Sequence, residues 1–223
     1  MEKKPFFSVI VTEHNSEQYM HKMLNSINEQ SFRNIEVIVV CDKCSDNTFE
    51  EAKLFTYKSR GDKVLQTDFG RCGLARNAAL DIAKGEWILF ADDDDWWLHE
   101  FAFELIADVA KVSDQADLLC FGFLARNFVE QEGLHYFMNC PVNYPPCYRM
   151  WAAPWNKAWR RSFIGEHRFP DWEHSDDLGF AREMHPLAAG RMLFIDTPLY
   201  YYNYMRPGSI ADRLRTGELE AIE

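Results

Sequence analysis

The chain has 223 residues, and its 35 acidic and 24 basic residues give it a formal net charge of −11. This charge excludes sequence-blind binding of nucleic acid and a polybasic membrane anchor, because both depend on clustered Lys and Arg. The hydrophobic content of 47% suffices for a core, and no apolar run approaches the roughly 20 residues that cross a bilayer. We therefore expect one soluble, cytoplasmic domain over residues 1–223, without a transmembrane segment.

The first part of the chain predicts strands that alternate with helices. Apolar, β-branched runs predict buried strands at 6–12, 35–41, 63–67 and 87–91. Apolar spacing and capping residues predict helices from Asn15 or Ser16 to about Asn28, from the turn at 42–47 to about Tyr57, and from Cys72 to Ala83. This alternation indicates parallel βαβ units of an α/β fold.

The pattern weakens after residue 123. The apolar run 118–125 suits another buried strand, whereas 130–146 is rich in Pro, Asn, Tyr and Cys and predicts an irregular insertion. A helix is expected at 154–161, because Pro154 would stand near its first turn. The remaining expectations are a short amphipathic helix at 176–185 and strands at 192–195 and 199–204.

The chain contains six cysteines, of which Cys41 and Cys44 form a C-x-x-C pair. No second pair stands at zinc-finger spacing, and a C-x-x-C is a strong zinc signal only with such a partner. We therefore expect a reduced cytosolic protein with free thiols.

Polar side chains follow each strand of the predicted parallel sheet. Thr12 and Glu13 follow the first strand, Asp42 the second, Asp68 the third, and the run 92–95 the fourth. In open α/β sheets, ligands bind beyond the carboxyl ends of the strands. The sequence therefore predicts a polar, acidic site at this edge.

The run 92–95 consists of four consecutive aspartates. Such carboxylates repel one another unless a cation lies nearby, and hard carboxylate oxygens favour Mg²⁺ or Mn²⁺. A solvated acidic loop is the alternative, but the run sits between a buried strand and Trp96-Trp97-Leu98. Carboxylates and a divalent cation together bind a diphosphate and stabilise its departure. The site is thus suited to a reaction whose leaving group is a nucleoside diphosphate.

The ordered motifs of the chain resemble those of family 2 glycosyltransferases with the GT-A fold. The likeness runs from about residue 6 to 210, and the order and spacing of the motifs carry it. The matching segments are Ser8-Val9-Ile10-Val11-Thr12, Gln30-Ser31-Phe32, Ser45-Asp46-Asn47-Thr48, Gly73-Leu74-Ala75-Arg76-Asn77, Asp92-Asp93-Asp94-Asp95-Trp96, Trp155-Asn156-Lys157, Ser175-Asp176-Asp177 and Arg206-Pro207-Gly208-Ser209.

The resemblance implies a mostly parallel, Rossmann-like sheet and a nucleotide-sugar site in residues 1–95. Thr12 and Glu13 would line the nucleotide pocket, and Asp42 would accept a hydrogen bond from the base, uracil in most members. Arg76 matches a residue near the base or the diphosphate; pairing with helix carboxylates is its alternative role. In the acidic run, Asp92 and Asp93 would face the ribose and the sugar, while Asp94 would coordinate Mn²⁺ or Mg²⁺.

The same resemblance places a smaller acceptor-side region in residues 96–223. Asp177 would act as the general base of inverting transfer, with Asp176 as its competitor. Trp155 and Trp159 could stack on a sugar acceptor or simply pack in the core. Arg206 would meet the departing diphosphate or form a surface salt bridge. The acceptor would be a saccharide or a lipid-linked saccharide, reached in the cytoplasm or in peripheral contact with the inner face of the membrane.

Two departures qualify the resemblance. The usual acidic-acidic-Gly-Ser turn is here Cys41-Asp42-Lys43-Cys44, so one acid remains to read the base. The Q-x-x-R-W motif of processive synthases is absent, which favours transfer of one sugar at a time in bacterial polysaccharide synthesis. A sugar-phosphate nucleotidyltransferase is an alternative, although Val11-Thr12-Glu13-His14-Asn15 lacks the Gly-rich turn and Lys of that class. A non-catalytic nucleotide- or carbohydrate-binding module is the other.

Overall fold

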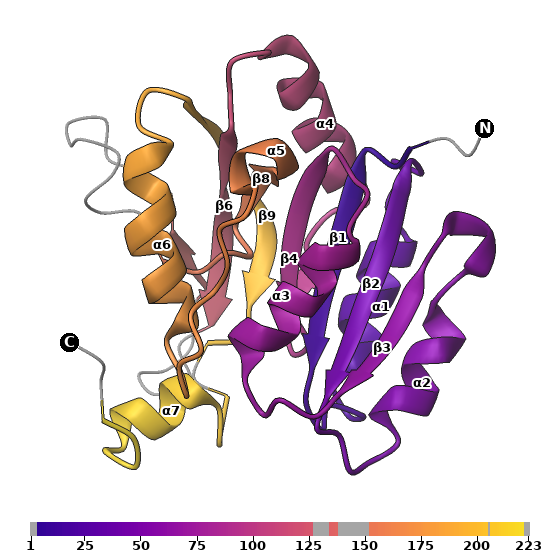
Figure 1. Ribbon diagram of the computed structural model, residues 1–223, viewed down its shortest axis with the longest axis vertical. Coiled ribbons are helices and arrows are strands. Elements are labelled where there is room, and N and C mark those ends of the chain that lie inside the picture. Colours follow the sequence, from indigo (N-terminus) through magenta and orange to yellow (C-terminus); the bar gives the residue numbers. More distant parts are fainter. Residues whose placement is uncertain (1–3, 127–133, 138–151, 205, 221–223) are drawn as a thin grey trace.

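The computed structural model of the chain describes residues 4–126, 134–137, 152–204 and 206–220 (Figure 1). The strands are β1 (Phe7–Glu13), β2 (Ile35–Asp42), β3 (Lys63–Thr67), β4 (Trp87–Asp92), β5 (Trp96–Trp97), β6 (Leu118–Arg126), β7 (Leu134–Phe137), β8 (Lys157–Arg160) and β9 (Met192–Tyr202). The helices are α1 (Met20–Asn28), α2 (Thr48–Phe55), η1 (Lys58–Arg60), α3 (Cys72–Ile82), α4 (Ala102–Val112), α5 (Arg161–Ile164), α6 (Asp176–Leu187) and α7 (Ile210–Arg215). One mixed sheet joins all these strands in the order β3-β2-β1-β4-β8-β6-β9-β5, with β7 beside β6.

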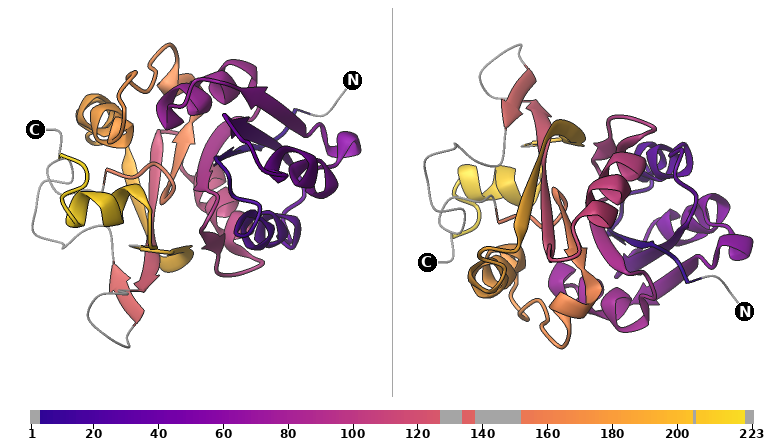
Figure 2. Two further views of the ribbon diagram at one scale, coloured as in Figure 1. Left: turned by 90° about the horizontal axis from the view of Figure 1, so that it is seen from below. Right: turned by 90° about the horizontal axis from the view of Figure 1, so that it is seen from above.

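The predicted parallel half is confirmed. β1 pairs in parallel with β2 and β4, and β2 pairs in parallel with β3. Alternate side chains of β1 serve two different cores: Val9 and Val11 pack beneath α1, α2 and α4, whereas Ile10 packs beneath α3 and α6. Helices therefore cover both faces of the sheet (Figure 2), which explains why its strands are apolar throughout.

The prediction of a helix at 154–161 is wrong. Residues 157–160 form β8, which lies antiparallel between β4 and β6. The tryptophans at 155 and 159 have helical spacing, but they fall on opposite faces of the sheet, Trp155 in one core and Trp159 in the other. Tertiary pairing with two neighbouring strands thus overrides the local pattern.

Other boundaries also differ from the predictions. α1 begins at Met20, because the carbonyl of Ser16 accepts hydrogen bonds from the N–H groups of Tyr19 and Met20 in a separate turn, and no side chain caps the helix. The two C-terminal strands form one strand, β9, and the pattern gave no sign of α4. The predicted irregular insertion at 130–146 lies outside the described residues apart from β7. Among the described residues, no helix is long and apolar enough to cross a membrane.

Candidate donor and acceptor site

The carboxyl ends of the parallel strands meet at one edge, as the sequence predicts. In the register of β1 with its neighbours, Thr12 lies opposite Asp92 of β4, and Glu13 lies opposite Cys41 of β2. Asp42 ends β2, and the aspartate run begins at the last residue of β4. Polar side chains from distant parts of the sequence are therefore neighbours here, whereas Asp68 lies exposed in the loop after β3.

The aspartate run is not a solvated loop. Asp95 is fully buried and the other members are half-buried. Burial, followed by the charge of Asp94, raises the pKa of Asp93 to about 7, and burial also raises the pKa values of Asp94 and Asp95. Glu13 is buried beside them, and burial and the charge of Asp93 raise its pKa well above the usual value. Positive charge at this place would reverse these shifts.

Residues of β9 and of the segment after it complete this cluster. The main-chain N–H of Asp92 donates to the hydroxyl of Tyr200 at 3.1 Å, and that of Asn203 donates to Asp95 Oδ1 at 2.8 Å. Arg206 forms an ion pair with Asp94, and its guanidinium carbon lies 4.6 Å from the ring centroid of Tyr19. Arg206 is therefore part of the acidic site and not a surface bridge. Sequence reasoning did not assign a role to Tyr200 or Asn203, because a strand tyrosine and a main-chain donor leave no motif.

Arg76 joins the acidic run to the helix that carries the predicted base. Its guanidinium donates to Asp92 Oδ1 and to Asp176 Oδ2, each at 2.8 Å, and the residue is only 5% exposed. A Cβ on Gly73, in the first turn of α3, would stand 3.0 Å from the Cβ of Asp176, so this glycine permits the close approach of α3 and α6. The pairing of Arg76 with carboxylates, one of its two predicted roles, is thus present.

The two acidic residues that begin α6 have different surroundings. Asp176 is buried against Arg76, and burial raises its pKa although the charge of Arg76 opposes the shift. Asp177 is half-buried, and its Oδ1 accepts a hydrogen bond from the N–H of Leu178 at 2.8 Å. An acceptor hydroxyl would thus find Asp176 engaged and Asp177 more accessible.

Asp42 holds the loop between β3 and α3. Its Oδ1 accepts from Thr67 Oγ1 and from the N–H of Phe69, both at 2.8 Å, and its Oδ2 accepts from the N–H of Arg71 at 3.0 Å. The residue is 5% exposed. Its demonstrated contacts are therefore structural, and recognition of a base remains a prediction. A cavity of about 420 Å³ beside it is lined by Lys43, Cys44, Ser45, Gln66, Thr67 and Asp68.

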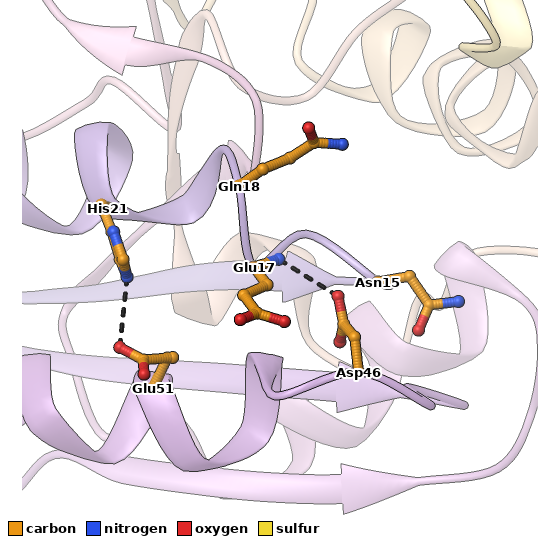
Figure 3. A pocket seen from close by; sticks show the side chains of 6 residues that line it. All are labelled: Asn15, Glu17, Gln18, His21, Asp46 and Glu51. Carbon is orange, nitrogen blue, oxygen red and sulfur yellow. Dashed lines mark hydrogen bonds and ion pairs between the residues drawn. The ribbon is translucent and has the colours of Figure 1, made fainter.

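A second cavity, of about 520 Å³, lies between α1 and α2 (Figure 3). Three of its six lining residues are acidic. Two contacts cross it: His21 pairs with Glu51 at 3.3 Å, and the N–H of Glu17 donates to Asp46 at 3.3 Å. None of the predicted site residues lines this cavity. The cavity therefore lies apart from the predicted site residues.

The predicted acceptor platform is wrong in this conformation. Trp155 is 2% exposed and stacks on Tyr200 with ring centroids 4.8 Å apart. Trp159 is fully buried and donates from Nε1 to the carbonyl of Pro154 at 3.2 Å. Both side chains pack in the core, the alternative that the sequence left open, so neither offers a face to a sugar.

The fit of a divalent cation depends on its ligands. Within the described residues, no group of three or more His, Cys, Asp or Glu side chains is arranged to hold a metal. Mg²⁺ in nucleotide sites takes one or two carboxylates and completes its shell with water and substrate phosphates, so a full protein cage is not required. Asp93 and Asp94 offer hard carboxylate oxygens whose pKa values are raised, and these residues fit such a cation.

Comparison with known proteins gives consistent results. The family model "Glycosyl transferase family 2" matches residues 8–161. The chain is 28% identical over 217 residues to the putative glycosyltransferase EpsH of Bacillus subtilis, covering 89% of this chain and 60% of the relative. It superposes on Staphylococcus aureus TarS 1–349 in complex with UDP-GlcNAc with a TM-score of 0.77 and 28% identity, covering 92% of this chain and 60% of that one.

A more distant structure shares the fold. The mannosyltransferase PcManGT of Pyrobaculum calidifontis, in complex with GDP-Man and Mn²⁺, gives a TM-score of 0.72 at 18% identity, covering 97% of this chain and 62% of that one. The structural neighbours are GT-A glycosyltransferases, so the predicted GT-A fold is confirmed. The chain spans about 60% of the length of EpsH and of TarS 1–349.

Proposed function

The chain belongs to glycosyl transferase family 2, and on this premise we propose that it is an inverting enzyme that moves one sugar from a nucleotide-diphosphate donor to a hydroxyl acceptor. The observation that carries the proposal is the Arg76 bridge. It joins an acidic run at the end of β4 to a pair of carboxylates on α6. A donor diphosphate and an acceptor hydroxyl need two such walls on opposite sides of one anomeric carbon.

The donor is proposed to be a UDP-sugar, supported by the likeness to TarS in complex with UDP-GlcNAc. Thr12 and Glu13 would line the nucleotide pocket at the end of β1, and Asp92 and Asp93 would face the ribose and sugar. Asp42 would contact the base through a remaining acceptor site, since an ionised carboxylate has about four such sites and three contacts are present.

Asp94 would hold a divalent cation, Mn²⁺ or Mg²⁺, together with the donor diphosphate. When bound, the ion would neutralise the charge that develops on the departing diphosphate. Asp94 pairs with Arg206, so this guanidinium lies beside the carboxylate that would hold the cation. Arg206 would also bind a diphosphate oxygen, the ligand for which its fork of donors is suited.

Asp177 would act as general base. It would take the proton of the acceptor hydroxyl as that oxygen attacks the anomeric carbon. Asp176 would be a positioning residue, because its carboxylate is engaged by Arg76 and fixes the first turn of α6. The acceptor side would comprise parts of residues 96–223, and its acceptor is proposed to be a saccharide or lipid-linked saccharide in polysaccharide synthesis. The cytoplasm, or the inner face of its membrane, would be the site of action.

A donor panel tests this proposal. The purified chain would be heated with UDP-, GDP- or TDP-sugars in the presence of Mn²⁺, because a ligand that binds the folded state raises the melting temperature by mass action. We expect the largest rise with a UDP-sugar, followed by slow release of UDP from it. A nucleotidyltransferase would instead release pyrophosphate from UTP and a sugar phosphate. A binding module would be stabilised without releasing UDP, and either outcome would contradict the proposal.

A further inference from the structure

The turn after β2 brings two cysteines together at the donor site. Cys41 is fully buried on β2, and Cys44 lies half-buried beyond its end. Lys43 between them has a φ of 52°, in the left-handed region, and the chain bends here. Both cysteines contact the same core beneath α1 and α2. Their side chains therefore lie on one face of the sheet although an extended strand would have placed them on opposite faces.

The contacts of Cys44 fix its position relative to Cys41. Its sulfur lies 3.5 Å from the carbonyl oxygen of Glu13 and 3.8 Å from that of Asp42. Glu13 is the residue of β1 directly opposite Cys41. The Cys44 thiol thus reaches back over the strand pair that holds Cys41, and both thiols pack on the same face of the sheet.

The two thiols differ in reactivity. The neighbouring thiol of Cys41 lowers the pKa of Cys44 to about 7, whereas the thiol of Cys44 and burial raise the pKa of Cys41. A thiolate is the attacking species in disulfide exchange, and a pKa near ambient pH is favourable for it. Cys44 also lines the cavity of about 420 Å³, so a small reagent can reach it while Cys41 stays covered. This asymmetry is that of an attacking and a resolving thiol.

We propose that Cys41 and Cys44 form a reactive dithiol that is oxidised by small-molecule disulfides, and that closure of the Cys41–Cys44 disulfide weakens donor binding. The second part rests on the proposed function, because it takes this edge of the sheet as the nucleotide pocket. The first part depends only on the two thiols and their access to the cavity.

The exchange balances in two steps. The Cys44 thiolate attacks one sulfur of the small disulfide, forms a mixed disulfide and releases one small thiolate, which takes up a proton. The Cys41 thiol then loses its proton and attacks Cys44 Sγ of the mixed disulfide, which releases the second small thiol. The two protein sulfurs are oxidised and the small disulfide is reduced to two thiols.

Closure would change the turn that orders the donor pocket. A disulfide sulfur has no S–H to donate, so the hydrogen bonds from Cys44 to the carbonyls of Glu13 and Asp42 are lost. The neighbouring N–H of Lys43 donates to the carbonyl of Thr67 at 2.8 Å, and the Asp42 carboxylate holds Thr67 and the loop beyond it. A shift of the turn would therefore reach the predicted base-contacting residue.

The first experiment equilibrates the full chain with mixtures of reduced and oxidised glutathione, alkylates the free thiols and maps the peptides by mass. We expect the peptide with Cys41 and Cys44 to lose two hydrogens and to escape alkylation. Cys41→Ser should keep glutathione on Cys44, whereas Cys44→Ser should take up no glutathione at Cys41. If the wild-type chain stops at a glutathione adduct on Cys44, or remains fully alkylated, the dithiol is refuted.

The second experiment measures UDP affinity by calorimetry with Mn²⁺ before and after oxidation. We expect about a tenfold loss, which corresponds to 1.4 kcal/mol, and no loss in a redox-blind chain with both Cys41→Ser and Cys44→Ser. A disulfide that forms without any change in affinity would overturn the link to the donor. A reduced chain that does not bind UDP at all would contradict the proposed function, while the peptide map still decides the dithiol.

Discussion

Both ends of the parallel sheet bury acidic side chains, but the pKa values of these side chains are shifted in opposite directions. At the amino end, Glu36 accepts hydrogen bonds from Ser8 Oγ at 2.6 Å, from Lys63 Nζ at 2.8 Å and from the N–H of Lys84 at 2.6 Å. Burial by itself would raise the pKa of Glu36, but these donors outweigh burial and lower the pKa. At the carboxyl end, burial raises the pKa values of Asp93, Asp94 and Asp95.

This difference separates a structural acid from acids that need a ligand. Glu36 carries its own counter-charge and donors, so its charge serves the fold. Within the described residues, Asp95 Oδ2 and Glu13 Oε1 are buried without a hydrogen-bond partner, and the members of the run repel one another. Such a cluster costs folding stability, which enzymes accept where charge is used in function. We infer that the carboxyl end is arranged for a positively charged ligand.

The largest effect is expected from substitution of Asp177, the proposed general base on α6. Removal of a general base typically lowers the rate about 10²–10⁴-fold. Asp177→Asn should therefore bind UDP-sugar and metal normally, yet transfer sugar at least about a hundredfold more slowly. Turnover assays with saturating donor measure this.

The matched control for the base is its neighbour. Asp176→Asn removes the charge that pairs with Arg76 and should weaken the positioning of α6 without removing the base. If Asp177→Asn keeps full turnover while Asp176→Asn is inactive, the base is Asp176. Full turnover in both variants would refute acid–base catalysis by α6.

Opposite pH dependences should distinguish the two ends. The pKa of Asp93 is raised from 3.8 to about 7, so the folded protein binds this proton more tightly than the unfolded chain does. The stability that the proton contributes is therefore lost as pH rises from about 4 to 7. The pKa of Glu36 is lowered, so its contribution is present at neutral pH and lost as the solution becomes strongly acidic. Without metal, the free energy of unfolding should decline between pH 4 and 7 by an amount on the order of a few kcal/mol. Asp93→Asn should flatten this decline.

Thermal unfolding at several pH values in EDTA gives this measurement. Glu36→Gln is the control, and it should lower stability at neutral pH by about 1–3 kcal/mol, the range for a hydrogen-bonded charge, while the decline between pH 4 and 7 persists. A wild-type melting temperature that rises steadily over this range would show that the aspartate run is not destabilising.

A smaller effect is expected at the base-binding edge. Asp42→Ala should weaken UDP binding by roughly 1–3 kcal/mol, because it removes a charged hydrogen-bond acceptor and frees the loop from Thr67 to Arg71. Thr67→Val tests the loop alone, since it removes one donor to Asp42 and no contact with a base. Equal UDP affinity in Asp42→Ala and the parent would exclude Asp42 from the donor site.

The parallel half could be predicted because its information is local. Each strand is a short apolar run, each helix has its own spacing, and the carboxyl edge follows from the order of the elements. The helix expected at 154–161 failed because only pairing with β4 and β6 makes this segment a strand. Lys157 illustrates the difficulty: it is fully buried, and its ammonium donates to the carbonyl of Ala153 and to Asn156 Oδ1, both at 2.7 Å.

The sequence predicted the acidic residues of the site, but it did not predict the groups that form hydrogen bonds with them. Four aspartates in a row are visible in the sequence, whereas the hydroxyl of Tyr200 and the main-chain N–H of Asn203 reach them only through the register of β9. The fork of Arg76 likewise joins residues that are 16 and 100 positions away along the chain. Long-range contacts of this kind follow from tertiary packing, which a local pattern does not encode.

Calorimetry of UDP binding with Mn²⁺ and with EDTA examines whether the aspartate run binds its ligand through a cation. We predict that UDP binds at least about tenfold more tightly with Mn²⁺, a difference of 1.4 kcal/mol, because the bare carboxylates repel a diphosphate. Asp94→Asn should lose most of this gain and remain folded, and Glu36→Gln should keep it. Equal affinity in the two buffers for the wild-type chain would contradict a cation site at the carboxyl end of the sheet.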